Sequence, residues 1–181
     1  MYLFIVLYAY KVENQRIQGL YHWALLPHAT EDLDARSLIP ATVYQITNEG
    51  DGNWKTDHRR VNVLNTDRMI GFVRLPEVKT ITEETMSQFI SELPATHDRE
   101  SYPRDAQHWS CAWWAIRVIR SFIDAGIMDN PFPFRIGGDE WFEKFKQRVQ
   151  ARGMTLEGRS FQVLARLDSG GRDMSSVIVD L

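Results

Sequence analysis

The spacing of apolar residues in this chain changes near residue 80, and this change most restricts the folds that the chain can adopt. Before that point, short apolar runs rich in aromatic and β-branched side chains are separated by polar turns, as in β-strands. After it, apolar residues recur every three or four positions, which is the period of a helix that buries one face. Strands followed by helices predict an α+β fold in which a mainly antiparallel sheet packs against helices.

Five strands are predicted in the first part of the chain. They cover residues 2–10, 20–26, 41–47, 54–63 and 69–75. Turn-forming residues separate these runs, most clearly the glycine-rich cluster at 48–53 that follows the third strand.

Two helices follow. The first is predicted over 80–93, where Thr80 and Glu83 have the spacing of a capping box. The second, over 109–126, has the clearest helical period in the chain. The polar stretch between them, residues 97–107, is expected to form an exposed loop.

The last part of the chain is predicted to contain one more helix and two strands. Asp139 is expected to cap a helix that runs to Arg152, and Gly153 is expected to end it. The alternating pattern at 160–167 predicts a strand, and 176–179 predicts a short final one.

Composition restricts the class of protein and of partner. A chain of 181 residues with 44% apolar residues, no internal repeat and no linker is expected to form one domain. The net charge of -3 argues against nucleic acid or an anionic membrane surface as the main partner. No apolar run approaches the roughly 20 residues that a membrane-spanning helix needs.

The start of the chain and its cysteine content suggest a compartment. The first ten residues are apolar, but they lack the basic leading segment and the small-residue cleavage site of a signal peptide. The single cysteine cannot form a disulfide within the chain. We therefore expect a cytoplasmic protein.

The only cysteine, Cys111, lies in the first turn of the helix predicted over 109–126. Backbone N–H groups and the helix dipole stabilise a thiolate at such a position, and the thiolate is the reactive form of cysteine. The alternative is a packing role, because free cysteine is among the most buried residue types and Cys111 shares the apolar face of its helix.

Two polar side chains in the predicted sheet provide partners for this thiol. His22 lies in the apolar strand over 20–26, and a neutral imidazole within hydrogen-bond reach of a thiol can take its proton. Gln45 lies in the strand over 41–47, where its amide oxygen is able to orient the His22 ring and select its tautomer. Both residues have an alternative interpretation as satisfied polar groups of the core.

These residues resemble the circularly permuted papain-like proteins of the NlpC-type thiol-enzyme superfamily, which includes lecithin retinol acyltransferase-like and phospholipid acyltransferase branches. The resemblance rests on His22-Trp23-Ala24 in a strand, a polar residue one strand later and a helix-opening Cys111. In those branches the histidine precedes the cysteine, as it does here. Small fungal proteins of this type are especially similar.

The resemblance implies roles for three residues and a fold. His22 matches the base, Cys111 the nucleophile and Gln45 the third polar position, which is often histidine in the acyltransferase relatives. The chain departs from the pattern at Ser110 and Ala112, where relatives have asparagine and a polar residue. The resemblance covers residues 1–127, which would form a permuted papain-like core, and leaves 128–181 as a C-terminal helix and strand extension.

The function expected from this resemblance is acyl transfer through a thioester, either hydrolysis of an amide or ester or transfer to an amine or hydroxyl. The substrate would be a small molecule or a peptide, and the reaction requires no cofactor and no metal. Backbone N–H groups near the helix start, including that of Cys111, would hold the oxyanion. Two alternatives stay open: a non-catalytic binding module of the same fold, and non-covalent acid–base chemistry by His22.

Other candidates are weaker. His108 precedes the cysteine by three residues and is the main rival base. Trp23 and Trp114 are candidate pocket residues, with aromatic core packing as the alternative. The charged segment 57–60 is expected to belong to a solvated basic patch. Three further histidines lie in segments predicted to be exposed: His28, His58 and His97.

Overall fold

The computed structural model describes residues 1–13, 15–38, 40–48, 52–66, 68–98, 102–132, 138–168 and 174–181. Its main sheet has the strand order β2-β1-β7-β8, formed by β1 (Tyr2–Val12), β2 (Gln15–His28), β7 (Met69–Arg74) and β8 (Ile178–Asp180). β1 runs antiparallel to both β2 and β7, whereas β8 runs parallel to β7. The α+β class is therefore confirmed, but the main sheet is mixed.

The parallel pair has a topological cause. All three α-helices lie between β7 and β8 in the chain, and a connection of this length can return the chain to the sheet in the same direction. The strand predicted at 176–179 is found as the 3₁₀ helix Ser175–Val177 followed by β8.

Two short antiparallel ribbons lie beside the main sheet. One pairs β3 (Ala41–Val43) with β6 (Arg59–Val61), and the other pairs β4 (Ile46–Asn48) with β5 (Trp54–Thr56). The predictions of single strands over 41–47 and 54–63 were therefore wrong, because each segment is broken near its middle. The turn cluster predicted at 48–53 lies partly outside the described residues.

The break in the first of these segments results from hydrogen bonding. Tyr44 pairs with Leu25 of β2 through two backbone hydrogen bonds of 2.7 and 2.8 Å. At the next residue, the Gln45 N–H donates to Nδ1 of the His58 ring instead of to a carbonyl on a neighbouring strand. The Gln45 carbonyl accepts from the Asp57 N–H at 2.9 Å, so the two ribbons remain joined at this point.

The first two helices begin at hydroxyl caps. α1 (Glu83–Glu92) is capped by Thr82, whose Oγ1 accepts from the Thr85 N–H at 3.2 Å, and not by Thr80 as the capping-box spacing predicted. α2 (Cys111–Asp124) is capped by Ser110. In the loop predicted over 97–107, the end of the segment instead forms the 3₁₀ helix Ala106–His108.

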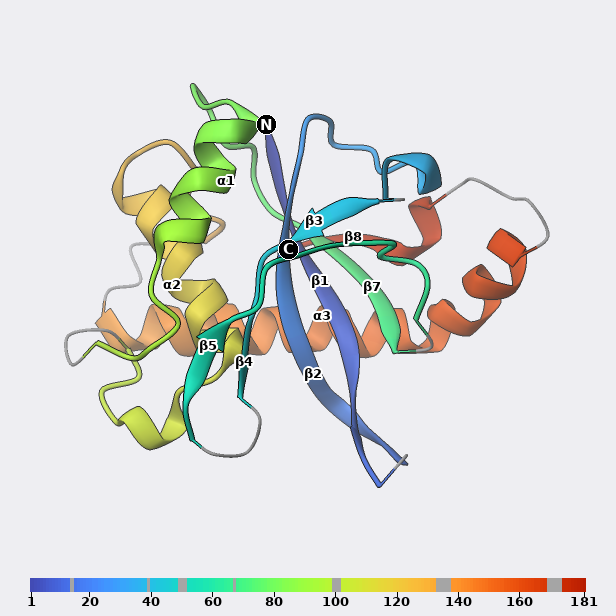
Figure 1. The fold of residues 1–181 in the computed structure, drawn as a ribbon, viewed down its shortest axis with the longest axis horizontal. Coiled ribbons are helices and arrows are strands. Elements are labelled where there is room, and N and C mark those ends of the chain that lie inside the picture. The colour runs from blue at the N-terminus through green and yellow to red at the C-terminus, as the bar shows by residue number, and fades with distance from the viewer. Residues whose placement is uncertain are drawn as a thin grey trace.

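The third helix differs most from the prediction. α3 (Gly138–Asp168) is continuous, so the predicted helix end at Gly153 and the predicted strand at 160–167 were both wrong. Gly153 is needed for close packing, because a Cβ at this position would lie 2.4 Å from the ring of Tyr21 in β2. Glycine here lets the helix approach the sheet and does not end it. Figure 1 shows α3 crossing the strands.

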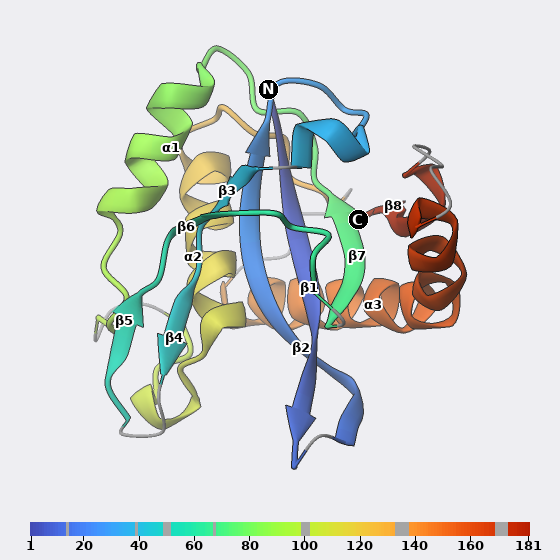
Figure 2. The ribbon, with the colours of Figure 1, turned by 45° about the vertical axis from the view of Figure 1, so that its right-hand side comes forward.

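Alternate residues of the strands enter two separate apolar clusters. In β1, Leu3, Ile5 and Leu7 pack toward the three α-helices. Phe4 and Val6 pack toward the segment that contains the 3₁₀ helix Ala35–Leu38. In Figure 2, α3 passes behind β1 and β2, whereas the chain that follows β6 passes in front of them. The sheet is thus covered on both faces, and polar groups gather at its β2 edge.

Candidate functional site

The candidate site lies at the β2 edge of the main sheet. β2 pairs with β1 on one side, and on the other it bridges to the small ribbons at Leu25. Two residues earlier, the backbone N–H of Trp23 lies near enough to the Cys111 thiol to lower its pKa. The start of α2 therefore meets the strand through this sulfur atom.

The start of α2 is formed by residues that suit a helix N-terminus. Ser110 has an extended backbone, with φ of -158° and ψ of 169°, and its Oγ accepts from the Trp113 N–H at 3.4 Å. Cys111 is the first helical residue and is half-buried. The N–H of Ala112, a free amide of the first helical turn, also lowers the pKa of this thiol.

A line of hydrogen bonds extends from His22 away from this thiol. Nε2 of His22 lies 2.8 Å from Oε1 of Gln45, and Nε2 of Gln45 donates to Oδ2 of Asp57 at 2.9 Å. The other Asp57 oxygen accepts from Nε of Arg59. Because an amide oxygen only accepts, Nε2 of His22 carries the hydrogen, and Nδ1 is left for the thiol.

The two reactive groups shift each other's protonation. Burial alone would raise the pKa of the Cys111 thiol, but the charge and hydrogen bond of His22 and the two backbone N–H groups lower it below its ordinary value. Burial alone would lower the pKa of His22, but Cys111, Gln45 and the Asp57 charge raise it above its ordinary value. Both shifts favour a thiolate–imidazolium pair.

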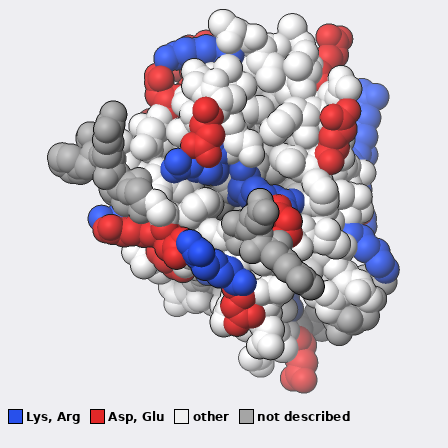
Figure 3. All heavy atoms as spheres, turned by 90° about the vertical axis from the view of Figure 1, so that its left-hand side faces the viewer, with Lys and Arg blue, Asp and Glu red and all other residues white. Residues whose placement is uncertain are grey.

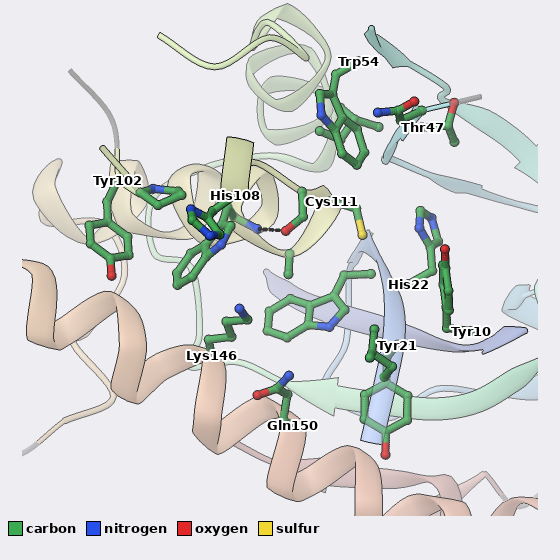
Figure 4. A pocket seen from close by; sticks show the side chains of 18 of the residues that line it. Tyr10, Tyr21, His22, Thr47, Trp54, Tyr102, His108, Cys111, Lys146 and Gln150 are labelled. Atoms are coloured by element: carbon green, nitrogen blue, oxygen red, sulfur yellow. Dashed lines mark hydrogen bonds between the residues drawn. The ribbon is translucent and has the colours of Figure 1, made fainter. Parts of the chain in front are cut away.

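The thiol and the imidazole open on a cavity of about 940 Å³. In Figure 4 the Cys111 sulfur points toward the His22 ring, with Trp54 on one side of the cleft and the α3 residues Lys146 and Gln150 on another. Aromatic side chains are prominent among the lining residues. The aromatic residues that line it are Tyr10, Tyr21, Trp23, Trp54, Tyr102 and Trp113, together with His22 and His108. A cleft of this size and character is suited to an organic substrate with an apolar body.

The structure brings the three predicted site residues together. Of the weaker candidates, two line the cavity and one does not. Trp23 lines the cavity. Trp114 is fully buried and is not among the lining residues, because the helical rotation turns its neighbour Trp113 toward the cleft. His108 lines the cavity, but its Nδ1 pairs with Asp105 at 3.2 Å and its side chain is 73% exposed.

Two residues of the site were missed by the sequence analysis. Asp57 was assigned to a solvated basic patch, and His58 to an exposed segment. His58 is half-buried, its ring lies beside those of Tyr44 and Trp114, and burial lowers its pKa. Asp57 and His58 lie opposite Gln45 only because both strands break there, and residue spacing carries no signal of that break.

Metal-binding clusters and membrane-spanning helices were also sought among the described residues. No group of three or more potential metal ligands is found among them. None of the helices in the described part of the chain is long and apolar enough to span a membrane. On the face that carries α1 and α2, acidic and basic side chains are interspersed, as in the ion pairs Arg117–Asp98 and Arg120–Asp124 (Figure 3).

Fold and site together define an α+β protein with a cysteine, a histidine and a glutamine aligned at a sheet edge beside an aromatic cleft. The chain belongs to DUF6914, a protein family of unknown function whose model matches residues 1–129. The matched segment contains Cys111, His22 and Gln45 and ends before α3. A search of curated proteins gave no match, and a search of solved structures gave none either.

Proposed function

We propose that the protein is a cysteine-dependent acyl-transfer enzyme that uses Cys111, His22 and Gln45. The observation that carries this proposal is the placement of the Cys111 thiol against the His22 imidazole, which lowers the pKa of the thiol and is itself hydrogen-bonded to the Gln45 carboxamide, beside the aromatic cleft. A thiol whose pKa is lowered by an adjacent imidazole is an activated nucleophile.

In the proposed reaction, the Cys111 thiolate attacks the carbonyl carbon of an amide or ester. The oxyanion of the tetrahedral intermediate is held by backbone N–H groups at the start of α2, including that of Cys111. The His22 imidazolium gives its Nδ1 proton to the departing amine or alkoxide, and a thioester is left on the sulfur.

The second half of the reaction restores the enzyme. His22, now neutral, takes a proton from water or from an acceptor amine or hydroxyl as that group attacks the thioester carbonyl. The carbon–sulfur bond breaks and the acyl product leaves, and Cys111 is again a thiolate beside an imidazolium. Gln45 orients the ring throughout and does not itself exchange a proton.

Two further proposals accompany this function. The order of histidine before cysteine and the helix-opening thiol support a relationship with the permuted papain-like enzymes, whose third polar position Gln45 would occupy. A thiol enzyme needs its cysteine reduced, and a cytoplasmic location would supply that condition.

Alkylation of Cys111 by iodoacetamide across pH tests the proposal. Only the thiolate reacts, so the lowered pKa of Cys111 moves the midpoint of the rate profile below that of an ordinary thiol. In His22→Ala the imidazolium is lost, the pKa of Cys111 rises, and the rate at neutral pH falls about tenfold or more, since one pKa unit is a factor of ten. A profile that is identical in wild type and His22→Ala would contradict the proposal.

The same variants separate the alternatives. A Cys111 that stays unreactive at pH values where ordinary thiols react would favour a non-catalytic binding module. Once a turnover assay exists, Cys111→Ser is expected to abolish activity, whereas full activity in that variant would favour non-covalent acid–base chemistry by His22.

A further inference from the structure

One wall of the cleft is formed by α3, which lies outside the segment matched by the family model. Three of its residues line the cavity: Glu143, Lys146 and Gln150. Their spacing of three and then four positions places them on one face of the helix. In Figure 4, Lys146 and Gln150 extend from α3 toward the cleft that contains Cys111.

The acidic member of this set already has a partner. Oε1 of Glu143 accepts a hydrogen bond of 2.6 Å from the hydroxyl of Tyr102 across the cleft. This bond raises the pKa of Tyr102 to about 12, so the tyrosine hydroxyl remains a hydrogen-bond donor to Glu143 near neutral pH.

The other two groups are available. Nζ of Lys146 lies 4.4 Å from the centroid of the Trp113 ring, and no carboxylate among the described residues forms an ion pair with it. The side-chain amide of Gln150 has no hydrogen bond to another described residue. Lys146 is half-buried, and an ammonium and a carboxamide one helical turn apart can together donate to both oxygens of a carboxylate.

We propose that α3 determines substrate choice, and that Lys146 with Gln150 binds a carboxylate on the acyl substrate. This inference rests on the acyl-transfer function proposed for Cys111, because it assigns the substrate class of the same cleft. The aromatic lining, to which Trp54 and Trp113 belong, contacts the apolar body of the substrate. The substrate class is therefore an acyl compound that combines an apolar, ring-sized group with a carboxylate.

Two matched pairs of ligands test the carboxylate preference in the full-length protein. 4-Phenylbutyrate is compared with 4-phenylbutanamide, and N-acetylphenylalanine with its amide, so that a free acid and a peptide-type carboxylate are distinguished. Binding is read from intrinsic tryptophan fluorescence, since three tryptophans line the cavity: Trp23, Trp54 and Trp113. We expect at least one of the two acids to bind about fivefold or more tightly than its amide, as one partly buried charge pair gives.

Variants of α3 supply the controls. Lys146→Met is expected to abolish the preference and Lys146→Glu to reverse it, whereas Lys146→Arg keeps it and shows that the fold tolerates substitution at this position. Lys144→Met removes a lysine that pairs with Glu140 and does not line the cavity, so it is expected to leave the preference unchanged. Gln150→Leu is expected to reduce the preference about twofold to threefold.

The outcomes separate this inference from the proposed function. Equal binding of acid and amide by the wild type, a preference that survives in Lys146→Met, or no binding of any of the four compounds at about 10 mM would overturn it. Protection of Cys111 from iodoacetamide by the same ligands gives the second readout. A reactive Cys111 in a protein that shows no preference for carboxylate ligands would refute this inference and leave the proposed function intact. An unreactive Cys111 in a protein whose carboxylate preference depends on Lys146 would refute the proposed catalysis and leave the binding inference intact.

Discussion

A glutamine beside a histidine is an ambiguous partner, because its amide presents either an acceptor or a donor. In this protein Asp57 resolves the ambiguity. A carboxylate only accepts, so its contact with Nε2 of Gln45 directs Oε1 toward the His22 ring. The orientation of one amide thereby selects the imidazole tautomer with Nδ1 free to act on Cys111. We therefore infer that Asp57 is a positioning residue that acts on the His22 ring through Gln45.

Replacing Asp57 should therefore change the protonation of a ring that it does not contact. In Asp57→Leu the Gln45 amide loses its acceptor, and the loss of negative charge lowers the pKa of His22 from its raised value. The imidazolium then persists only to a lower pH, and the thiolate that it stabilises forms less readily. We expect the alkylation rate of Cys111 at neutral pH to fall about tenfold, at the lower end of what outer-sphere partners contribute in metal sites.

Asp57→Asn is the matched control for this prediction. Its amide oxygen can still accept from Gln45, so orientation is kept while the charge is lost, and the alkylation rate should lie between those of wild type and Asp57→Leu. Arg59, the other partner of Asp57, is 61% exposed and can be solvated when the aspartate is removed. A wild-type pH profile in Asp57→Leu would show that Gln45 is oriented by something else.

At the residue scale, the sequence indicated which residues form the candidate site, but it did not indicate which residue hydrogen-bonds Gln45 from behind. Cys111, His22 and Gln45 were selected as candidate site residues because of where they lie. A cysteine at a helix start is favoured to ionise, and a polar side chain in an apolar strand needs a hydrogen-bond partner. Asp57 lies among charged neighbours, where a carboxylate needs no explanation. Only the paired strand breaks place it behind Gln45.

At the scale of elements, α3 shows why a glycine in a helical pattern can mislead. Gly153 has the neighbours of a helix end, yet the helix continues on both sides of it. What the position requires is the absence of a Cβ against the Tyr21 ring of β2, a contact between residues that lie far apart in the chain. The reason for glycine at this position is therefore a tertiary contact, which the local sequence does not reveal.

Two glycines in the same helix allow this explanation to be tested. Gly153→Ala should destabilise the protein by about 1–3 kcal/mol, as overpacking a filled interior does, because the buried Tyr21 ring must move. Gly158→Ala, where an added Cβ meets nothing within 4 Å, should stabilise it by about 0.5–1 kcal/mol through helix propensity alone. Urea unfolding of both variants measures the difference. Equal effects of the two substitutions would mean that Gly153 does not serve packing.

At the scale of the whole molecule, the matched family segment and the folded unit do not coincide. The family model ends at residue 129, but the apolar face of α3 belongs to the same buried cluster as β1, β2 and α2. Among the described side chains of α3, the fully buried members are Trp141, Phe145, Val149 and Leu156. The α+β class was predictable from the change in hydrophobic period. The mixed sheet was not, because β8, the parallel partner of β7, comes from the far end of the chain.

This interdependence predicts that a chain ending at residue 129 will not fold cooperatively. Among the described side chains it would lose the four fully buried members of α3 and also Val177, which are worth about 1.5–3 kcal/mol each. That loss is large against a typical total stability of about 5–15 kcal/mol. It would also uncover the Tyr21 ring and remove β8 from the edge of β7. The truncated protein should show no sharp thermal or urea transition by circular dichroism.

The truncation also bears on the site. Because α3 supplies a wall of the cleft while Cys111, His22 and Gln45 precede residue 129, a cooperative fold in the shortened chain would separate the proposed catalysis from the proposed substrate choice. Cys111 in such a chain would keep its lowered reaction midpoint and lose any preference for carboxylates. Loss of folding instead means that α3 stabilises the sheet edge that holds the imidazole and the helix start that holds the thiol, so that stability and the proposed specificity depend on the same helix.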